Sequence, residues 1–153
     1  MAELCTSVTN FTIWLFVCGS FRRPKWQIMS VNVRYIVNSV EDSISFYTKK
    51  LGFKVDFHPA PGFAALSKDN LKLYINSPGA GGAGQSMPDG TVPSPGGWNR
   101  IQIEVKNLES FVSKLKSDNA SFRNEIVKGQ GGNQILLKDP SGNLIELFEP
   151  KSN

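Results

Sequence analysis

The feature that most constrains the fold of this chain is a pattern of apolar periodicities that occurs twice. Residues 31–37 alternate between apolar and polar positions, as a half-buried strand does, and an amphipathic helix and three strands follow up to residue 76. The same order is predicted again between residues 99 and 149, although the two halves share little sequence. We therefore predict an α+β fold of two βαβββ modules, with eight strands and two main helices.

Both predicted helices have recognisable ends. Ser39 is a suitable N-cap for a helix that Gly52 would end, and Asn107 is a suitable N-cap for the second helix. Apolar residues recur at helical spacing in both segments, so each helix has one face that can pack on a sheet. In such a module the side chains of opposite parity line a concave surface, and two modules side by side would form a curved mixed-sheet cup for a small ligand.

The second module is predicted to close with a hairpin around the turn Asp139-Pro140-Ser141-Gly142. Asp139 can accept a hydrogen bond from the backbone two residues on, and Gly142 tolerates the positive φ that the turn requires. In the strand that follows, the carboxylate of Glu146 points away from the apolar face formed by its neighbours. A carboxylate in the middle of such a strand is the chain's strongest candidate for a functional side chain.

The segment between the modules, residues 77–98, is rich in Gly and Pro and has no apolar period. Its glycines at 79–84 are not followed by the Gly-Lys-Ser/Thr ending of a phosphate loop, so we interpret them as part of a lid or linker. Trp98 is expected to anchor the end of the linker as an apolar plug. The predicted organisation is an N-terminal extension (1–28), a first module (31–76), this linker (77–98) and a second module (99–150).

The first 28 residues stand apart from this pattern. The apolar run at residues 11–18 is shorter than the about 20 residues that a helix needs to span a bilayer. No small-residue cleavage site follows it, and Met29 lies just before the first predicted strand. We interpret residues 1–28 as an extension that need not be native; the alternative is a signal or anchor segment.

Charge and cysteine content narrow the classes of partner. The 153-residue chain has a net charge of +4, and its Lys and Arg are scattered among acidic residues without a basic stripe, which argues against nucleic-acid binding. The two cysteines form neither a metal pair nor a disulfide framework, so a reducing cytoplasm is the default location. We expect no membrane partner.

Two motifs carry a resemblance to a known family. The segments Phe46-Tyr47 with Leu51-Gly52-Phe53, and residues 139–147 with the order Asp-Pro-Ser-Gly-Asn-Leu-Ile-Glu-Leu, resemble the vicinal oxygen chelate superfamily. That group includes glyoxalase I, bleomycin-resistance proteins, fosfomycin-resistance transferases and extradiol dioxygenases. The resemblance implies the glyoxalase/bleomycin-resistance fold and a homodimer. It also implies that any metal would be held by the first and last strand of each module.

The positions that match the family's metal ligands carry few suitable donors. The first-strand positions fall on Asn32 and Arg100, and the last-strand positions fall on Glu146 and on Tyr74, or on Lys72 if the register differs by two. Of these four positions only Glu146 supplies a good ligand, and an Arg in place of a His would repel a cation. We therefore predict neither a bound metal nor another cofactor.

The same parity rule gives the candidate site. The predicted ligand-binding residues are Asn32, Arg34, Tyr74, Arg100, Gln102 and Glu146. Glu146 has two interpretations, an ion pair with Arg100 across the cup or a group that holds a ligand or acts as a catalytic base. The first predicts a small-molecule binding protein of the bleomycin-resistance kind with a degraded metal site; the second predicts a glyoxalase-like lyase or isomerase. A purely structural or partner-binding module is a third alternative.

Overall fold

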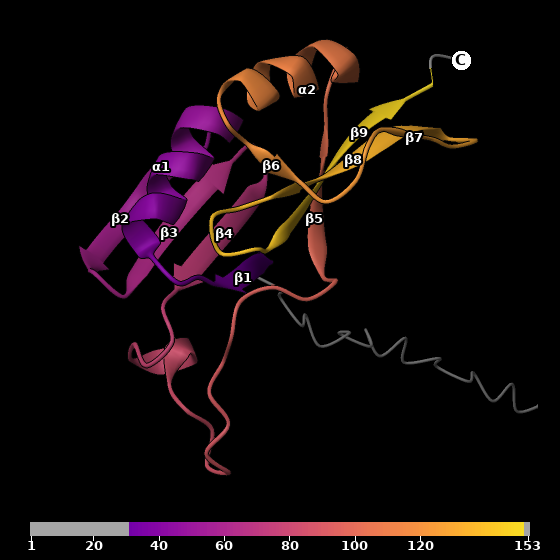
Figure 1. Cartoon of the computed structure of the whole chain (residues 1–153). Helices are drawn as coiled ribbons and strands as arrows, with labels where there is room; N and C mark the ends of the chain where they lie inside the picture. Colours follow the sequence, from indigo (N-terminus) through magenta and orange to yellow (C-terminus); the bar gives the residue numbers. More distant parts are fainter. Residues whose placement is uncertain (1–30, 152–153) are drawn as a thin grey trace, which may run out of the picture.

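The computed structural model describes residues 31–151, and the predicted N-terminal extension lies outside them (Figure 1). The first sheet has the order β1-β4-β3-β2, with β1 parallel to β4 and the other pairs antiparallel. Its strands are β1 (Asn32–Ile36), β2 (Lys54–Ala60), β3 (Phe63–Lys68) and β4 (Leu71–Asn76). Because both parallel and antiparallel pairs occur, this sheet is mixed, as predicted.

The second sheet repeats this arrangement with one more strand. Its order is β5-β9-β8-β6, with β5 parallel to β9, and β7 also pairs with β8. Its strands are β5 (Arg100–Glu104), β6 (Ser121–Phe122), β7 (Val127–Lys128), β8 (Gly132–Lys138) and β9 (Leu144–Pro150). Two mixed sheets with few helices confirm the predicted α+β class.

The strand predicted at residues 121–127 is divided in the structure, which raises the number of strands. Residues 121–127 were expected to form one strand, but they form two short ones, β6 and β7. Between them, the side chain of Asn124 accepts a hydrogen bond from the backbone N–H of Leu136 at 3.0 Å. This side-chain bond replaces a backbone ladder bond, so the strand is interrupted and the described residues contain nine strands instead of eight.

Both helices begin where the sequence predicted, and α1 also ends where it was predicted to end. Helix α1 (Val40–Leu51) is capped by Ser39, whose side chain accepts a hydrogen bond from the Asp42 N–H, and it ends at Gly52 with φ +70°. Helix α2 (Leu108–Ser117) is capped in the same way by Asn107. Figure 1 shows α1 covering the first sheet and α2 lying against the second. None of the helices described is long and apolar enough to cross a membrane.

The core lies between the helices and the sheets and is shared by both halves. The largest fully buried side chains come from α1, α2 and both sheets, among them Tyr47, Leu66, Ile75, Leu115, Ile135 and Leu147. The face of each sheet that turns away from the helices carries the polar residues of opposite parity. The candidate site residues lie on that face.

The turn between β8 and β9 joins the two halves. The Tyr47 hydroxyl on α1 donates to Oδ2 of Asp139 at 3.1 Å, and the Asn143 side-chain amide donates to the Ile36 carbonyl at 2.9 Å. The backbone N–H of Asn38 donates to the Ser141 hydroxyl at 2.8 Å. The hairpin turn therefore fixes the position of the second sheet relative to the first.

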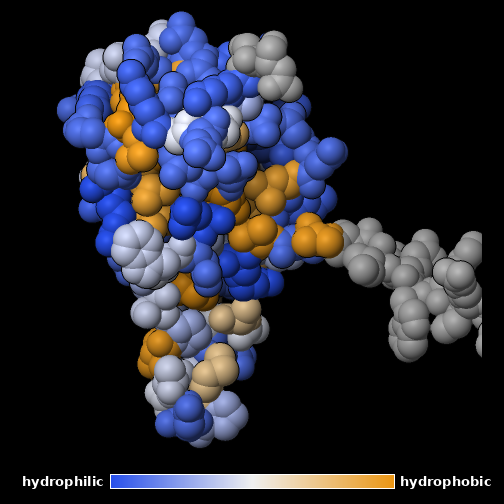
Figure 2. Space-filling view, turned by 90° about the vertical axis from the view of Figure 1, so that its right-hand side faces the viewer, coloured by the Kyte–Doolittle hydropathy of each residue, from blue (hydrophilic) through white to orange (hydrophobic). Residues whose placement is uncertain are grey.

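The linker between the sheets contains only one short helical element, η1 (Gly82–Gly84). Its first residues, 77–85, are closed by internal hydrogen bonds, including Gly79 N–H to the Gly84 carbonyl at 2.8 Å. The segment extends away from the sheets in Figure 1 and protrudes from the body of the molecule in Figure 2. Its near end folds back beside the first sheet, where the candidate cavity lies.

Candidate functional site

The second sheet holds Glu146 in a network of two charge-assisted hydrogen bonds. Gln102 on β5 lies directly opposite Glu146 on β9. Arg100 precedes Gln102 by two residues on the same strand. Nε of Arg100 donates to Oε2 of Glu146 at 2.6 Å, and Nε2 of Gln102 donates to Oε1 at 2.7 Å. Glu146 is 6% exposed. The predicted ion pair between Arg100 and Glu146 is confirmed, and Gln102 adds the second donor.

This network determines the ionisation of Glu146. Burial alone would raise the pKa of the carboxyl, because the charged form loses water. The hydrogen bonds from Gln102 and Arg100, together with the positive charge of Arg100, outweigh burial and lower the pKa of Glu146 below its ordinary value. Glu146 is therefore a carboxylate at neutral pH.

A pH dependence of stability follows from this shift. A carboxyl whose pKa is lowered in the folded state contributes stability above its unfolded pKa, and this contribution is lost as the pH falls through the folded pKa. We therefore expect the free energy of unfolding of the wild type to fall more steeply below about pH 4.5 than that of Glu146→Gln. Urea unfolding between pH 3 and pH 7 measures both curves; parallel curves would contradict the network.

Asp139 provides an internal reference for that experiment. Burial raises the pKa of the Asp139 carboxyl, so its contribution has the opposite sign and is lost as the pH rises through the folded pKa. Asp139 is present in both proteins, so the difference between the two curves isolates Glu146.

The residues around Glu146 do not fit a divalent metal. Both oxygens of its carboxylate already accept hydrogen bonds, and the nearest charged group is the guanidinium of Arg100, which cannot coordinate a cation and repels one. Within residues 31–151, no three His, Cys, Asp or Glu side chains gather in a group that could hold a metal ion. Catalytic metal sites use three or more protein donors, so this set is insufficient.

The first sheet carries a second cluster, built around Arg34 and Tyr74. These two residues lie opposite each other on β1 and β4, and the Arg34 guanidinium lies 5.2 Å from the centre of the Tyr74 ring. One guanidinium N–H group donates to Oδ1 of Asn76, and the ring of Phe63 meets that of Tyr74 edge to face at 5.7 Å. Asn32, at the start of β1, is exposed and pairs in register with Lys72.

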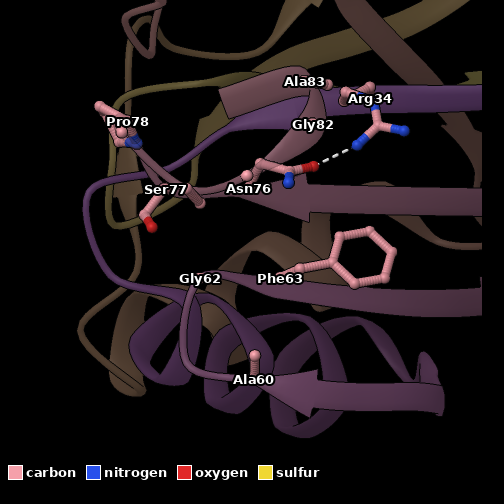
Figure 3. A pocket seen from close by; sticks show the side chains of 12 residues that line it. Arg34, Ala60, Gly62, Phe63, Asn76, Ser77, Pro78, Gly82 and Ala83 are labelled. Carbon is pink, nitrogen blue, oxygen red and sulfur yellow. Dashed lines mark hydrogen bonds between the residues drawn. The ribbon is translucent and has the colours of Figure 1, made fainter. Parts of the chain in front are cut away.

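A cavity of about 730 Å³ adjoins this cluster. It is lined by Arg34, Phe63 and Asn76 from the sheet, by Ala60 and Gly62, and by residues 77–83 of the linker (Figure 3). Of the six predicted ligand-binding residues, only Arg34 lines it. Arg100, Gln102 and Glu146 form their own cluster on the second sheet, so the structure places the predicted site residues in two groups.

Another cavity, of about 800 Å³, lies between α1 and the segment that follows α2, and the turn at Asp139 lines it too. It contains none of the predicted site residues. Its lining includes Lys49, Lys50 and Lys138 together with Asp42 and Asp118, so it has charges of both signs.

Three residues near the two clusters were not predicted from the sequence: Phe63, Asn76 and Arg123. Phe63 and Asn76 share the parity of Tyr74 along their antiparallel strands, and this signal was present in the sequence. Arg123, which lies between β6 and β7, was not singled out. Its guanidinium stacks 3.9 Å from the centre of the Trp98 ring, and Trp98 is 64% exposed. The prediction that Trp98 is an apolar plug is therefore wrong. Trp98 stacks on an arginine at the surface.

The model of a known protein family matches most of this chain. The model of the Glyoxalase/Bleomycin resistance protein/Dioxygenase superfamily matches residues 30–147. Among curated proteins, the bleomycin resistance proteins of Geobacillus stearothermophilus and Staphylococcus aureus are 26% identical over 120 residues, which cover 74% of this chain and 90% of theirs.

Solved structures show the same fold at lower identity. Lactoylglutathione lyase from Agrobacterium tumefaciens is 13% identical, with a TM-score of 0.60 and coverage of 83% of this chain and 96% of that chain. A glyoxalase/bleomycin resistance protein/dioxygenase from Nocardioides is 18% identical, with a TM-score of 0.63 and coverage of 83% and 86%. At such identities the likeness concerns the fold alone.

Proposed function

The chain belongs to the Glyoxalase/Bleomycin resistance protein/Dioxygenase superfamily, and we propose that it is a small-molecule binding protein of the bleomycin-resistance kind that uses no metal. The observation that carries this proposal is the network around Glu146. A guanidinium and an amide hold both oxygens of the one carboxylate that matches a metal-ligand position. The scaffold is kept while the ligand set for a cation is replaced by an internal ion pair.

Two further observations support binding over catalysis. Curated proteins that are 26% identical to this chain are named bleomycin resistance proteins, and the cavity beside Arg34 has a volume suited to a small molecule. As a base in a lyase or isomerase, Glu146 would have to release its hydrogen bonds first. A carboxyl whose pKa is lowered by hydrogen bonds from Gln102 and Arg100 is also a weak proton acceptor at neutral pH.

The proposal includes a homodimer in a reducing cytoplasm. The outer strand β2 exposes Val55 and Phe57, and Phe57 is 59% exposed, which is unusual for an aromatic residue on a sheet edge. A second copy of the chain would cover such residues and could bring the faces of two sheets together around a ligand. Sedimentation velocity measures this directly, and a monomer at all concentrations would remove the dimer from the proposal.

Calorimetry with divalent metals separates the two functions. We expect no stoichiometric binding of Zn²⁺, Ni²⁺ or Mn²⁺, and we expect stabilisation by at least one compound in a thermal-shift screen of small molecules. The control variant is Glu104→Gln, which changes an exposed carboxylate on the same strand as Gln102. Micromolar metal binding that Glu146→Gln abolishes and Glu104→Gln leaves intact would favour the metalloenzyme instead.

A further inference from the structure

We propose that the cavity beside Arg34 binds a small organic carboxylate with an apolar or aromatic body. This inference rests on the proposed function, because it names the class of ligand that the binding protein takes. It concerns the group on the first sheet and is independent of the ion pair on the second.

The argument starts from the charge of Arg34. Its side chain is exposed and its guanidinium is always protonated, and its hydrogen bond is to the neutral amide of Asn76. Among residues 31–151, no carboxylate lies within ion-pair distance of it, whereas Arg100 is held by Glu146. A guanidinium has five N–H donors in a planar fork that matches a carboxylate. Arg34 therefore presents a cation and spare donors where a ligand can reach them.

The lining indicates one negative charge on the ligand. Arg34 is the only charged residue among the described residues that line the cavity, and the others are apolar, glycine, serine or asparagine. A ligand with two charges, such as a phosphate monoester, would find only one positive charge to pair with among the described lining residues. A carboxylate has one charge and two oxygens, which one guanidinium can bind in a bidentate manner.

The rest of the lining suits an apolar body. Phe63 contributes a half-buried ring on the same face as Arg34 (Figure 3). Its edge-to-face contact with Tyr74 fixes its orientation. Ala60, Ala80 and Ala83 add methyl groups around it. A ligand that places its carboxylate on Arg34 can lay an aromatic or aliphatic body along Phe63.

The linker forms a wall that is already built before a ligand binds. The Ser77 N–H donates to the Gly62 carbonyl at 3.0 Å, and a Cβ at Gly62 would lie 2.6 Å from that of Ala80. A Cβ at Gly84 would lie 2.4 Å from the Ser77 carbonyl oxygen. These glycines allow the linker to pack closely against the β2–β3 turn and on itself, so little conformational entropy remains to be lost on binding.

Amide chemical shifts measured during titration with benzoate test the inference. We expect saturable shifts at residues 79–83 and at Phe63, no comparable shifts with the neutral isostere benzamide, and about tenfold weaker benzoate binding in Arg34→Met. Arg34→Lys should restore part of the affinity, because it keeps the charge but not the planar fork. Lys106→Met is the matched control, since it removes one positive charge at an exposed position outside the cavity.

Three outcomes would overturn the inference: no saturable binding of benzoate to the wild type, equal binding of benzamide, or unchanged benzoate affinity in a folded Arg34→Met. The amide spectrum of each variant shows whether it is folded. If a thermal-shift screen still finds neutral or cationic ligands, the proposed binding function stands and only the ligand class is wrong. If no compound in the screen stabilises the protein, the proposed function itself fails.

Discussion

Asp139→Ala is expected to lower the free energy of unfolding by about 3 kcal/mol, because it removes the acceptor on which the junction between the two sheets depends. Asp139 is 4% exposed. Its Oδ1 accepts from the backbone N–H groups of Ser141 and Asn143, and its Oδ2 accepts from the Tyr47 hydroxyl and the Asn143 amide.

The size of the effect follows from the groups left behind. Truncation leaves four donors without their partner, and each buried donor that stays unsatisfied costs about 1–3 kcal/mol. Two effects reduce the sum. Burial already penalises the charged form of Asp139 and raises the pKa of its carboxyl, and the neighbouring cavity admits water that can satisfy some of the donors.

Chemical denaturation of the wild type and three variants measures this effect. Tyr47→Phe removes one of the four bonds and should cost about 1 kcal/mol. Asp139→Asn keeps an acceptor for the turn, so its loss of unfolding free energy should lie between the losses of Tyr47→Phe and Asp139→Ala. If Asp139→Ala lies within about 1 kcal/mol of the wild type, the turn does not hold the two sheets together.

Asp139 also shows how far sequence reasoning reaches. The roles of Asp139 and Gly142 within the turn follow from local chemistry, and both are confirmed by the Ser141 N–H bond of 2.9 Å and the φ of +86° at Gly142. The bond from Tyr47 spans 92 residues in the sequence. No local pattern specifies such a partner, so the sequence predicts the turn but not its role as a junction.

The candidate site divides in the same way. Alternation along a strand predicted that Arg100, Gln102 and Glu146 share a face, because side-chain parity is a local property. The cavity depends on how the linker packs beside Gly62, and an aperiodic, glycine-rich segment carries no signal for that contact. For this reason the sequence found Arg34 but not the linker residues around it, whereas Phe63 could have been found from the parity of its strand.

Arg100→Ala should have the second largest effect, lowering the free energy of unfolding by about 2 kcal/mol. It leaves the buried Glu146 carboxylate with Gln102 as its one remaining donor in the network. The Arg100 side chain is 37% exposed, so solvent screens part of its charge, and the cost is smaller than for a fully buried pair.

Glu146→Ala should cost less, about 1 kcal/mol, because the half-exposed Arg100 can turn to water when its partner is removed. In the double variant Arg100→Ala/Glu146→Ala, the loss of unfolding free energy should be about 1 kcal/mol smaller than the sum of the two single losses. The reason is that both charges are removed, so neither remains unpaired. Denaturation of all four proteins at pH 7 gives this coupling energy.

A second cycle, between Arg100→Ala and Glu104→Ala, is the control. Glu104 lies on the same strand, is exposed, and makes no ion pair with Arg100, so the effects of these two changes should add within about 0.5 kcal/mol. If the Arg100–Glu146 cycle is as additive as this control, the two groups do not interact in solution. Glu146 would then be free to take a ligand or a proton, and the metal-free binding function would lose the observation on which it depends.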